Sequence, residues 1–207
     1  MTANSPEIRE SEAGCRLVII SGPSGAGKST VVRRLLDVSP VPLYPCVSAT
    51  TRAPRSGERE GRDYYFLSHA EFARRREAGD FLECKEVFGR GDWYGTPRSE
   101  VASGLAAGKW VLLEIDVEGA LAVKREVPQA LTIFIHPGSM EELERRLRRR
   151  GTESDQALRR RLEVARREMA ARKHYRYEVV NRDVDQAVRD ICDILTPSGD
   201  ESRCSKN

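Results

Sequence analysis

The feature that most constrains this chain lies in residues 16–38. A short apolar segment is followed by a glycine-rich turn and an amphipathic segment, and residues 22–29 follow the pattern G-x-x-x-x-G-K-[ST]. Between a strand and a helix, this pattern is typical of a phosphate-binding loop. Glycines let backbone N–H groups turn toward an anion, and the start of the helix adds partial positive charge. A plain glycine turn with a surface lysine would need neither the spacing nor the context, so we predict a nucleoside triphosphate site.

Further residues extend this predicted site. In such loops the lysine, here Lys28, reaches the β- and γ-phosphate oxygens, and the hydroxyl of Ser29 can bind Mg²⁺. Glu114 and Asp116 end an apolar segment that resembles a buried parallel strand, where an acid can bind Mg²⁺ opposite Ser29. For one of the two acids, capping the next helix is the alternative. The residues expected at the triphosphate are Gly22, Pro23, Ser24, Gly25, Ala26, Gly27, Lys28, Ser29 and Thr30.

Composition narrows the possible classes of protein. The 207 residues are 39% hydrophobic and 32% charged, and no apolar run approaches the ~20 residues of a membrane span. Five scattered cysteines without a C-x-x-C pair indicate free thiols in a reducing cytosol, so we expect a cytoplasmic protein without a membrane partner. A net charge of +3 is too small to indicate nucleic-acid binding by itself. Residues 141–176 nevertheless carry thirteen Lys/Arg against seven Asp/Glu, which suits a lid over phosphates, a nucleic-acid patch or a solvated helix face.

The order of elements predicts an α/β fold. Strand-like and helix-like segments alternate around the phosphate loop, which indicates a parallel sheet with helices on both faces and ligands at the carboxyl ends of its strands. Thr96 and Pro97 are expected to start a helix. We expect a disordered N-terminus (1–14), a core (15–43, 97–140 and 173–196), an inserted, mainly β lobe (44–96), a helical lid (141–172) and a disordered tail (197–207).

Arginines are dense on both sides of the predicted phosphate loop. Arg52 and Arg55 lie in the inserted lobe, and another cluster spans residues 145–161. Planar guanidinium groups match phosphate oxygens in two-pronged hydrogen bonding. Two arginine-lined lobes that flank a phosphate loop indicate a phosphate donor and a phosphorylated acceptor, which is the arrangement of a kinase.

The sequence resembles the bacterial-type guanylate kinase family from about residue 16 to residue 195. The stretches that carry the resemblance are SGPSGAGKST (21–30), VSATTRAPRSGE (47–58), DYYF (63–66), YGTP (94–97) and LEIDVEGA (113–120). The resemblance implies a P-loop nucleoside monophosphate kinase that transfers the γ-phosphoryl group of ATP to GMP and dGMP with Mg²⁺. It implies ATP and GMP as partners without nucleic acid, in a monomer or homodimer.

The resemblance also assigns the acceptor site. Glu83 matches the carboxylate that accepts hydrogen bonds from N1–H and the 2-amino group of guanine. Adenine lacks both donors, and a site of this kind rejects it by roughly 10⁴-fold. Ser48 and Thr96 match hydroxyls near the base, and Glu58 matches a residue that supports the clamp on the acceptor phosphate. The full set implied at GMP is Ser48, Arg52, Arg55, Glu58, Tyr64, Glu83, Tyr94, Thr96, Glu114 and Asp116.

For the donor side, the resemblance implies four catalytic residues, Lys28, Arg146, Arg150 and Arg161, of which the arginines belong to the lid. Asn181 matches a residue near the adenine of ATP, and the metal ligands are expected to be Ser29 and Asp116. Two assignments have structural alternatives. Tyr64 adjoins other aromatic residues and could pack in a core, and Asn181 could cap the last helix.

Two departures from the family pattern flank the expected acceptor site. Cys84 stands where an aromatic residue is usual, and the loop at 88–93 is about two residues longer than usual. Two other functions are alternatives. Guanylate-kinase-like modules that bind proteins typically lack an intact phosphate loop, and this chain has a complete one. A sugar phosphate acceptor has no base edge for Glu83 and Ser48 to recognise.

Overall fold

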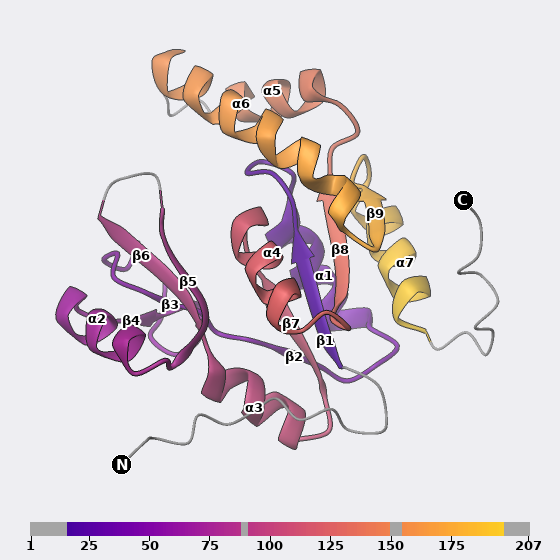
Figure 1. Ribbon diagram of the computed structural model, residues 1–207. Coiled ribbons are helices and arrows are strands. Elements are labelled where there is room, and N and C mark those ends of the chain that lie inside the picture. The colour runs from indigo at the N-terminus through magenta and orange to yellow at the C-terminus, as the bar shows by residue number, and fades with distance from the viewer. Residues whose placement is uncertain (1–15, 88–90, 150–154, 197–207) are drawn as a thin grey trace.

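The computed structural model describes residues 16–87, 91–149 and 155–196. Its core is a five-stranded parallel sheet in the order β2-β7-β1-β8-β9 (Figure 1). The strands are β1 (Leu17–Ser21), β2 (Leu43–Pro45), β7 (Trp110–Glu114), β8 (Leu131–His136) and β9 (Tyr177–Val180). The expected disordered termini, part of the longer loop and the predicted lid residue Arg150 lie outside the described residues.

The central strand β1 is buried on both faces because its apolar residues alternate between two cores. Val18 and Ile20 pack with α1 (Lys28–Val38) and α7 (Val184–Leu195). Leu17 and Ile19 pack on the other face with α3 (Arg98–Ala106) and α4 (Val117–Glu126). Helices therefore cover both faces of the sheet, as predicted from the continuous apolar runs. In the register of β1 and β7, Ile20 pairs with Glu114, so the phosphate loop and the acids at 114–116 leave the sheet side by side.

A second, four-stranded sheet in the order β4-β3-β6-β5 forms the lobe. It contains β3 (Ala49–Thr50), β4 (Tyr65–Phe66), β5 (Phe81–Val87) and β6 (Asp92–Pro97), with α2 (His69–Glu77) packed on it. Phe72 and Phe81 stack with ring centroids 4.5 Å apart and form a small separate core with Ala49. The prediction that Thr96 starts a helix is wrong. Residues 92–97 pair with β5, and α3 begins at Arg98 with Pro97 as its N-cap. The Thr96 hydroxyl donates to Glu83 across the strands and does not cap the helix.

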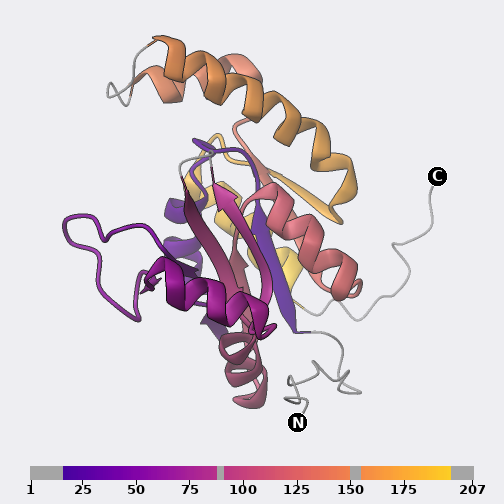
Figure 2. The same ribbon diagram turned by 60° about the vertical axis from the view of Figure 1, so that its left-hand side comes forward.

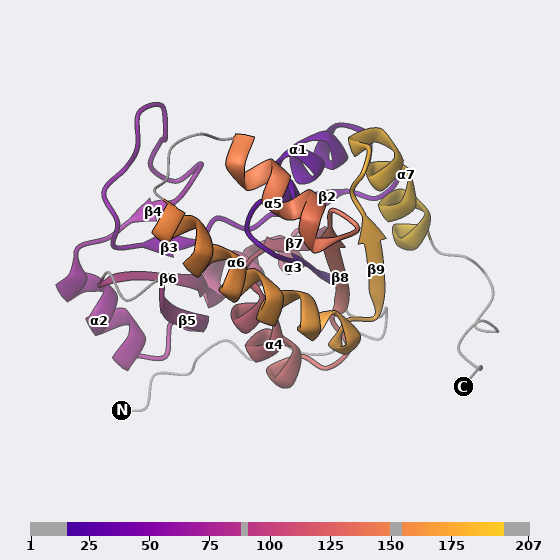
Figure 3. The ribbon, with the colours of Figure 1, turned by 90° about the horizontal axis from the view of Figure 1, so that it is seen from above.

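The segment predicted as the lid (141–172) lies in α5 (Met140–Arg149), α6 (Asp155–Ala170) and the start of the short helix η1 (Ala171–His174). It has its own apolar seam, made by Leu143, Leu147, Leu158, Leu162 and Ala165. In the side views (Figure 1, Figure 2) the lid lies beyond the carboxyl ends of the core strands, and the lobe lies beside the sheet. Seen from above (Figure 3), α6 crosses the molecule over these strand ends. No helix in the described part of the chain has the length and apolar character needed to cross a membrane.

Candidate active site

The loop between β1 and α1 closes tightly around its own lysine. Gly22 has φ +144°, and a Cβ atom there would overlap the carbonyl oxygen of Ile135 on the neighbouring strand. The Nζ atom of Lys28 donates hydrogen bonds to the carbonyl oxygens of Gly22 (2.7 Å) and Pro23 (3.2 Å). Burial lowers the pKa of Lys28, and the nearby Glu114, Glu168 and Asp116 carboxylates oppose that shift. The ammonium group is therefore held inside the loop.

This close approach gives a testable expectation for Gly22→Ala. The added Cβ atom meets backbone rather than a movable side chain, and an L-residue rarely adopts this φ, so the loop and β8 must shift apart. We expect a loss of about 2–4 kcal/mol in the free energy of unfolding, measured by denaturant titration, together with loss of ATP binding. Gly57→Ala is the matched control, since Gly57 also has positive φ (+87°) but an added Cβ atom would have no neighbour within 4 Å. A Gly22→Ala protein as stable as that control would contradict the expectation.

The two acids after β7 have different neighbours. The Ser29 hydroxyl donates to Oε1 of Glu114 at 2.6 Å. Asp116 instead caps α4, with Oδ1 accepting from the backbone N–H of Gly119 at 2.9 Å, and its Oδ2 lies 2.7 Å from Nζ of Lys85. The capping alternative is thus realised by Asp116. The structure brings Glu114 to Ser29, whereas Asp116 has two partners on the side of the lobe.

The residues predicted to form the phosphate clamp contact one another in the lobe. Arg52 makes a two-pronged pair with Glu58 (2.9 and 3.0 Å) and donates from Nε to the Tyr94 hydroxyl at 3.0 Å. These hydrogen bonds raise the pKa of Arg52 and lower the pKa of Glu58. Glu58 also accepts from the backbone N–H of Arg55 at 2.7 Å, while the Arg55 side chain is exposed. Tyr64 packs edge-on against Tyr94 and under the Arg52 guanidinium, so it both packs and faces the site.

Glu83 is a partly buried carboxylate on β5. Its Oε1 accepts from the Thr96 hydroxyl at 2.7 Å, across the β5–β6 pair. Its Oε2 lies 2.9 Å from where a Cβ atom would stand on Gly119, so only glycine leaves this space to the carboxylate. Burial raises the pKa of Glu83 to about 7, the Thr96 hydrogen bond opposes the rise, and the charge of Asp116 adds to it.

These parts face one cavity of about 700 Å³, here called the cleft, between the phosphate loop, the lobe and α6. Ser29, Glu58 and Thr96 are tied to it by hydrogen bonds to lining residues. The predicted site residues that line the cleft are Gly22, Ser24, Lys28, Ser48, Arg52, Arg55, Tyr64, Glu83, Tyr94, Glu114 and Asp116. The structure thus brings the loop, the clamp and Glu83 together.

Two of the three lid arginines predicted as catalytic, Arg146 and Arg161, are described by the structure, and both contact the loop. Arg161 donates to the Ser24 hydroxyl at 2.8 Å. Arg146 donates to Glu142 (2.7 Å) and to the carbonyl oxygen of Asn181 (2.8 Å), and it reaches the carbonyl of Ala26 at 3.5 Å. Because these contacts cross from lid to core, α5 and α6 are held over the loop.

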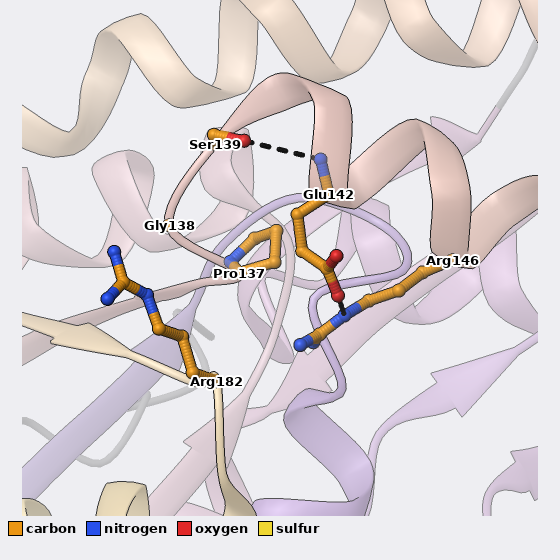
Figure 4. A pocket seen from close by; sticks show the side chains of 6 residues that line it. All are labelled: Pro137, Gly138, Ser139, Glu142, Arg146 and Arg182. Carbon is orange, nitrogen blue, oxygen red and sulfur yellow. Dashed lines mark hydrogen bonds and ion pairs between the residues drawn. The ribbon is translucent and has the colours of Figure 1, made fainter.

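A second, smaller pocket of about 340 Å³ lies between Arg146, Arg182 and the residues at 137–142 (Figure 4). In the close-up, Arg146 and Arg182 lie on either side of Pro137, and Ser139 caps the start of α5 at Glu142. Asn181 adjoins this region but is almost fully buried, and its amide donates to the carbonyl of Ala26 at 2.8 Å. The cap of α7 is Asp183, so the capping alternative for Asn181 is wrong and its side chain supports the phosphate loop.

Sequence reasoning missed five charged residues that line the cleft: Lys85, Glu86, Glu118, Arg167 and Glu168. Glu168 on α6 lines it near Lys28, and its Oε2 has no hydrogen-bond partner. Its spacing of seven residues from Arg161 places both on one helix face and could have indicated it. Lys85 also lines the cleft. It follows Glu83 by two residues on a strand, which places both side chains on the same face.

Comparison with known proteins agrees with this geometry. A family model described as guanylate kinase matches residues 14–198. This chain belongs to the guanylate kinase family. The guanylate kinase of Rhodopirellula baltica is 61% identical over 193 residues, which cover 93% of this chain and 92% of that protein. That of Rubrobacter xylanophilus is 49% identical over 180 residues, covering 87% and 93%. The crystal structure of guanylate kinase from Anaplasma phagocytophilum matches with a TM-score of 0.69 at 36% identity, covering 89% of this chain and 86% of that one.

Membership in the guanylate kinase family confirms the resemblance, the P-loop kinase fold and the enzyme class, a nucleoside monophosphate kinase. The structure also shows where Cys84, the first of the two departures from the family pattern, lies. Cys84 points to the opposite face of β5 from Glu83, and it packs on the lobe core of Ala49, Phe72 and Phe81. It is not among the residues that line the cleft. The residue that differs from the usual aromatic therefore lies away from the carboxylate of Glu83.

Proposed function

We propose that this enzyme transfers the γ-phosphoryl group of ATP to GMP, and likewise to dGMP, giving ADP and GDP or dGDP. One observation carries the proposal. The partly buried carboxylate of Glu83 and the arginines of the clamp share one cleft with Lys28 of the phosphate loop. A base-recognising acid, a phosphate clamp and a triphosphate site on one cavity are what a nucleoside monophosphate kinase requires.

Recognition of guanine is assigned to the ionised Glu83. A carboxylate has acceptors only, and it pairs with the adjacent N1–H and 2-amino donors of guanine. The Thr96 hydroxyl already donates to Oε1 and fixes the carboxylate, and Ser48 lines the same wall. With AMP, the N1 acceptor would face the carboxylate in a partly dry site, which costs several kcal/mol.

The acceptor phosphate is assigned to Arg52, Arg55, Tyr64 and Tyr94. Glu58 holds the Arg52 fork in a fixed orientation, so little side-chain entropy is lost when a phosphate binds. Arg55 is exposed and carries a cation that can move onto the phosphate. The clamp therefore combines one pre-oriented and one mobile guanidinium group.

ATP is assigned to the loop of residues 22–30, with its base toward the pocket of Figure 4. Lys28 exchanges its bonds to the Gly22 and Pro23 carbonyls for phosphate oxygens. Arg146 separates the loop from that pocket, where its planar guanidinium can stack on an adenine ring. Asn181 acts on ATP indirectly, because it holds the loop through Ala26.

The oxygen donors at Ser29 and Glu114 fit a magnesium ion, which usually takes one or two protein oxygens beside phosphates and water. Ser29 would hold it with Glu114 adjacent. Asp116, the metal ligand expected from the sequence, is bound instead by Gly119 and Lys85. When bound, Mg²⁺ neutralises charge that builds up on the phosphates. The protein itself contributes positioning and positive charge, because Lys28 and the lid arginines converge on the loop. Direct in-line transfer of the phosphoryl group needs no covalent enzyme intermediate.

The raised pKa of Glu83 predicts a pH dependence for GMP use. Only the ionised carboxylate accepts both guanine donors, so kcat/KM for GMP should fall about tenfold per pH unit below about pH 7. In Glu83→Gln this decrease in kcat/KM at low pH should disappear, whereas the decrease caused by protonation of the GMP phosphate should remain. The folded protein also holds this proton more tightly than the unfolded chain, so this group's contribution to stability falls as pH rises from about 4.5 to about 7. Equal pH profiles in the two proteins would contradict the assignment.

The proposal is tested by ADP formation across GMP, dGMP, AMP, UMP and ribose bisphosphate, with and without Mg²⁺. We expect turnover with GMP and dGMP, dependence on Mg²⁺, and a rate with AMP lower by roughly 10⁴-fold in kcat/KM. Ribose bisphosphate as the best acceptor would support the sugar kinase alternative. No ADP with any acceptor would support the protein-binding alternative.

A further inference from the structure

The lobe and the core meet at a charged contact made by Lys85. Its Nζ atom lies 2.7 Å from Oδ2 of Asp116 and 3.0 Å from Oε2 of Glu118. Lys85 belongs to β5 of the lobe, whereas Asp116 and Glu118 lie at the start of α4 in the core. The Lys85 side chain is 25% exposed and Asp116 34%, but Glu118 is 82% exposed. Because exposed pairs contribute little, the contact with Asp116 is the one that fixes geometry.

Lys85 completes the fixation of the Asp116 carboxylate. One oxygen, Oδ1, accepts from the backbone N–H of Gly119, and the other, Oδ2, is bound by Lys85. Both oxygens of the Asp116 carboxylate are therefore held by a partner. Without Lys85, only the helix cap remains, and the plane of the carboxylate can rotate about that single hydrogen bond.

The fixed carboxylate converges with Glu83. A Cβ atom on Gly119 would lie 2.9 Å from Oε2 of Glu83 and 3.5 Å from Oδ1 of Asp116, so both acids border the same small space. Two carboxylates this close repel each other unless a cation is near. Among the described residues of β5 and the first turn of α4 that line the cleft, Lys85 is the single cation.

Guanine offers three N–H bonds on this edge: N1–H and the two of its 2-amino group. A carboxylate bound in two-pronged fashion takes two of them, and one amino N–H is left over. A second fixed acceptor is needed, because an unpaired donor in a dry site costs free energy. Resting on the function proposed above, we propose that Lys85 is a positioning residue for guanine recognition, which holds Asp116 beside Glu83 to receive the second 2-amino N–H.

The test compares GMP with IMP, which lacks only the 2-amino group, in wild type, Lys85→Met and Lys85→Arg. Lys85→Met should lower kcat/KM for GMP by about tenfold or more, since a hydrogen bond to a charged group is lost. For IMP the change should stay below about threefold, and KM for ATP should not move. Lys85→Arg should recover most of the GMP preference. Lys109 is an exposed lysine outside the cleft. Lys109→Met removes the same charge and should leave kcat/KM unchanged for both GMP and IMP.

The decisive quantity is the ratio of kcat/KM for GMP to that for IMP. A ratio that Lys85→Met leaves unchanged overturns the proposal, whether both activities fall together or neither falls. Calorimetric binding of GMP and IMP gives the same ratio without turnover, and Lys85→Gln replaces Lys85→Met if the latter does not fold. A wild-type enzyme that does not use GMP would contradict the proposed function instead, so the two failures are distinguishable.

Discussion

Lys28→Ala is expected to lower kcat by about 10³-fold or more, with the fold intact. Lys28 is the cation inside the phosphate loop, and because it is partly buried its charge acts on bound phosphates with reduced solvent screening. Loss of one preorganised donor to a developing anion typically costs 10²–10³ in rate, and here a full charge is lost with it. The measurement is ADP formation at saturating ATP and GMP.

Two controls separate chemistry from folding for this variant. Circular dichroism and thermal melting should show a folded protein, although the carbonyls of Gly22 and Pro23 lose a donor. Lys109 is exposed, so the Lys109→Ala enzyme should have the kcat of the wild type. A folded Lys28→Ala enzyme with full turnover would exclude the loop as the site of the transferred phosphoryl group.

Glu83→Gln should have the second large effect, a fall of about 10²-fold or more in kcat/KM for GMP. The new amide presents N–H donors where the carboxylate presented acceptors, so donor would face donor inside a site with little water. The Thr96 hydroxyl can still donate to the remaining oxygen, so the local structure is retained. KM for ATP, which binds on the other side of the cleft, should stay within about twofold. These values come from initial rates with each substrate varied in turn.

The matched control for this second variant is Glu77→Gln, an exposed carboxyl near the end of α2. It removes the same charge from the lobe without touching the cleft, and GMP use should not change. If Glu83→Gln instead weakened ATP and GMP equally, the residue would be structural, and the assignment of guanine recognition to it would fail.

The phosphate loop could be predicted from the sequence because its pattern lies within a few consecutive residues. The phosphate loop needs glycines, a lysine and a hydroxyl at fixed spacing, and both flanking elements follow from apolar periodicity. The shared position of the loop and Glu114 follows from the rule that parallel strands end at one edge of a sheet. The convergence of the lobe with the loop was predicted from the two arginine-rich segments and from the resemblance, and residues of both line the cleft.

Contacts between distant elements could not be predicted. Whether Asp116 or Glu114 faces Ser29 depends on the direction in which α4 leaves the sheet, because the cap at Gly119 turns Asp116 away. The ion pair of Lys85 with Asp116 joins β5 of the lobe to the start of α4 across 31 residues of chain. Asn181 supports Ala26 across 155 residues, a contact with no sequence pattern of its own.

The most direct test of guanine recognition by Glu83 is the ratio of kcat/KM for GMP to that for AMP, measured in wild type beside Glu83→Gln. We predict a ratio of roughly 10⁴ in the wild type, because the carboxylate pairs with guanine donors that adenine lacks. The ratio should fall by about 10²-fold in the variant. A ratio that the substitution leaves unchanged would contradict the claim that Glu83 recognises the acceptor base.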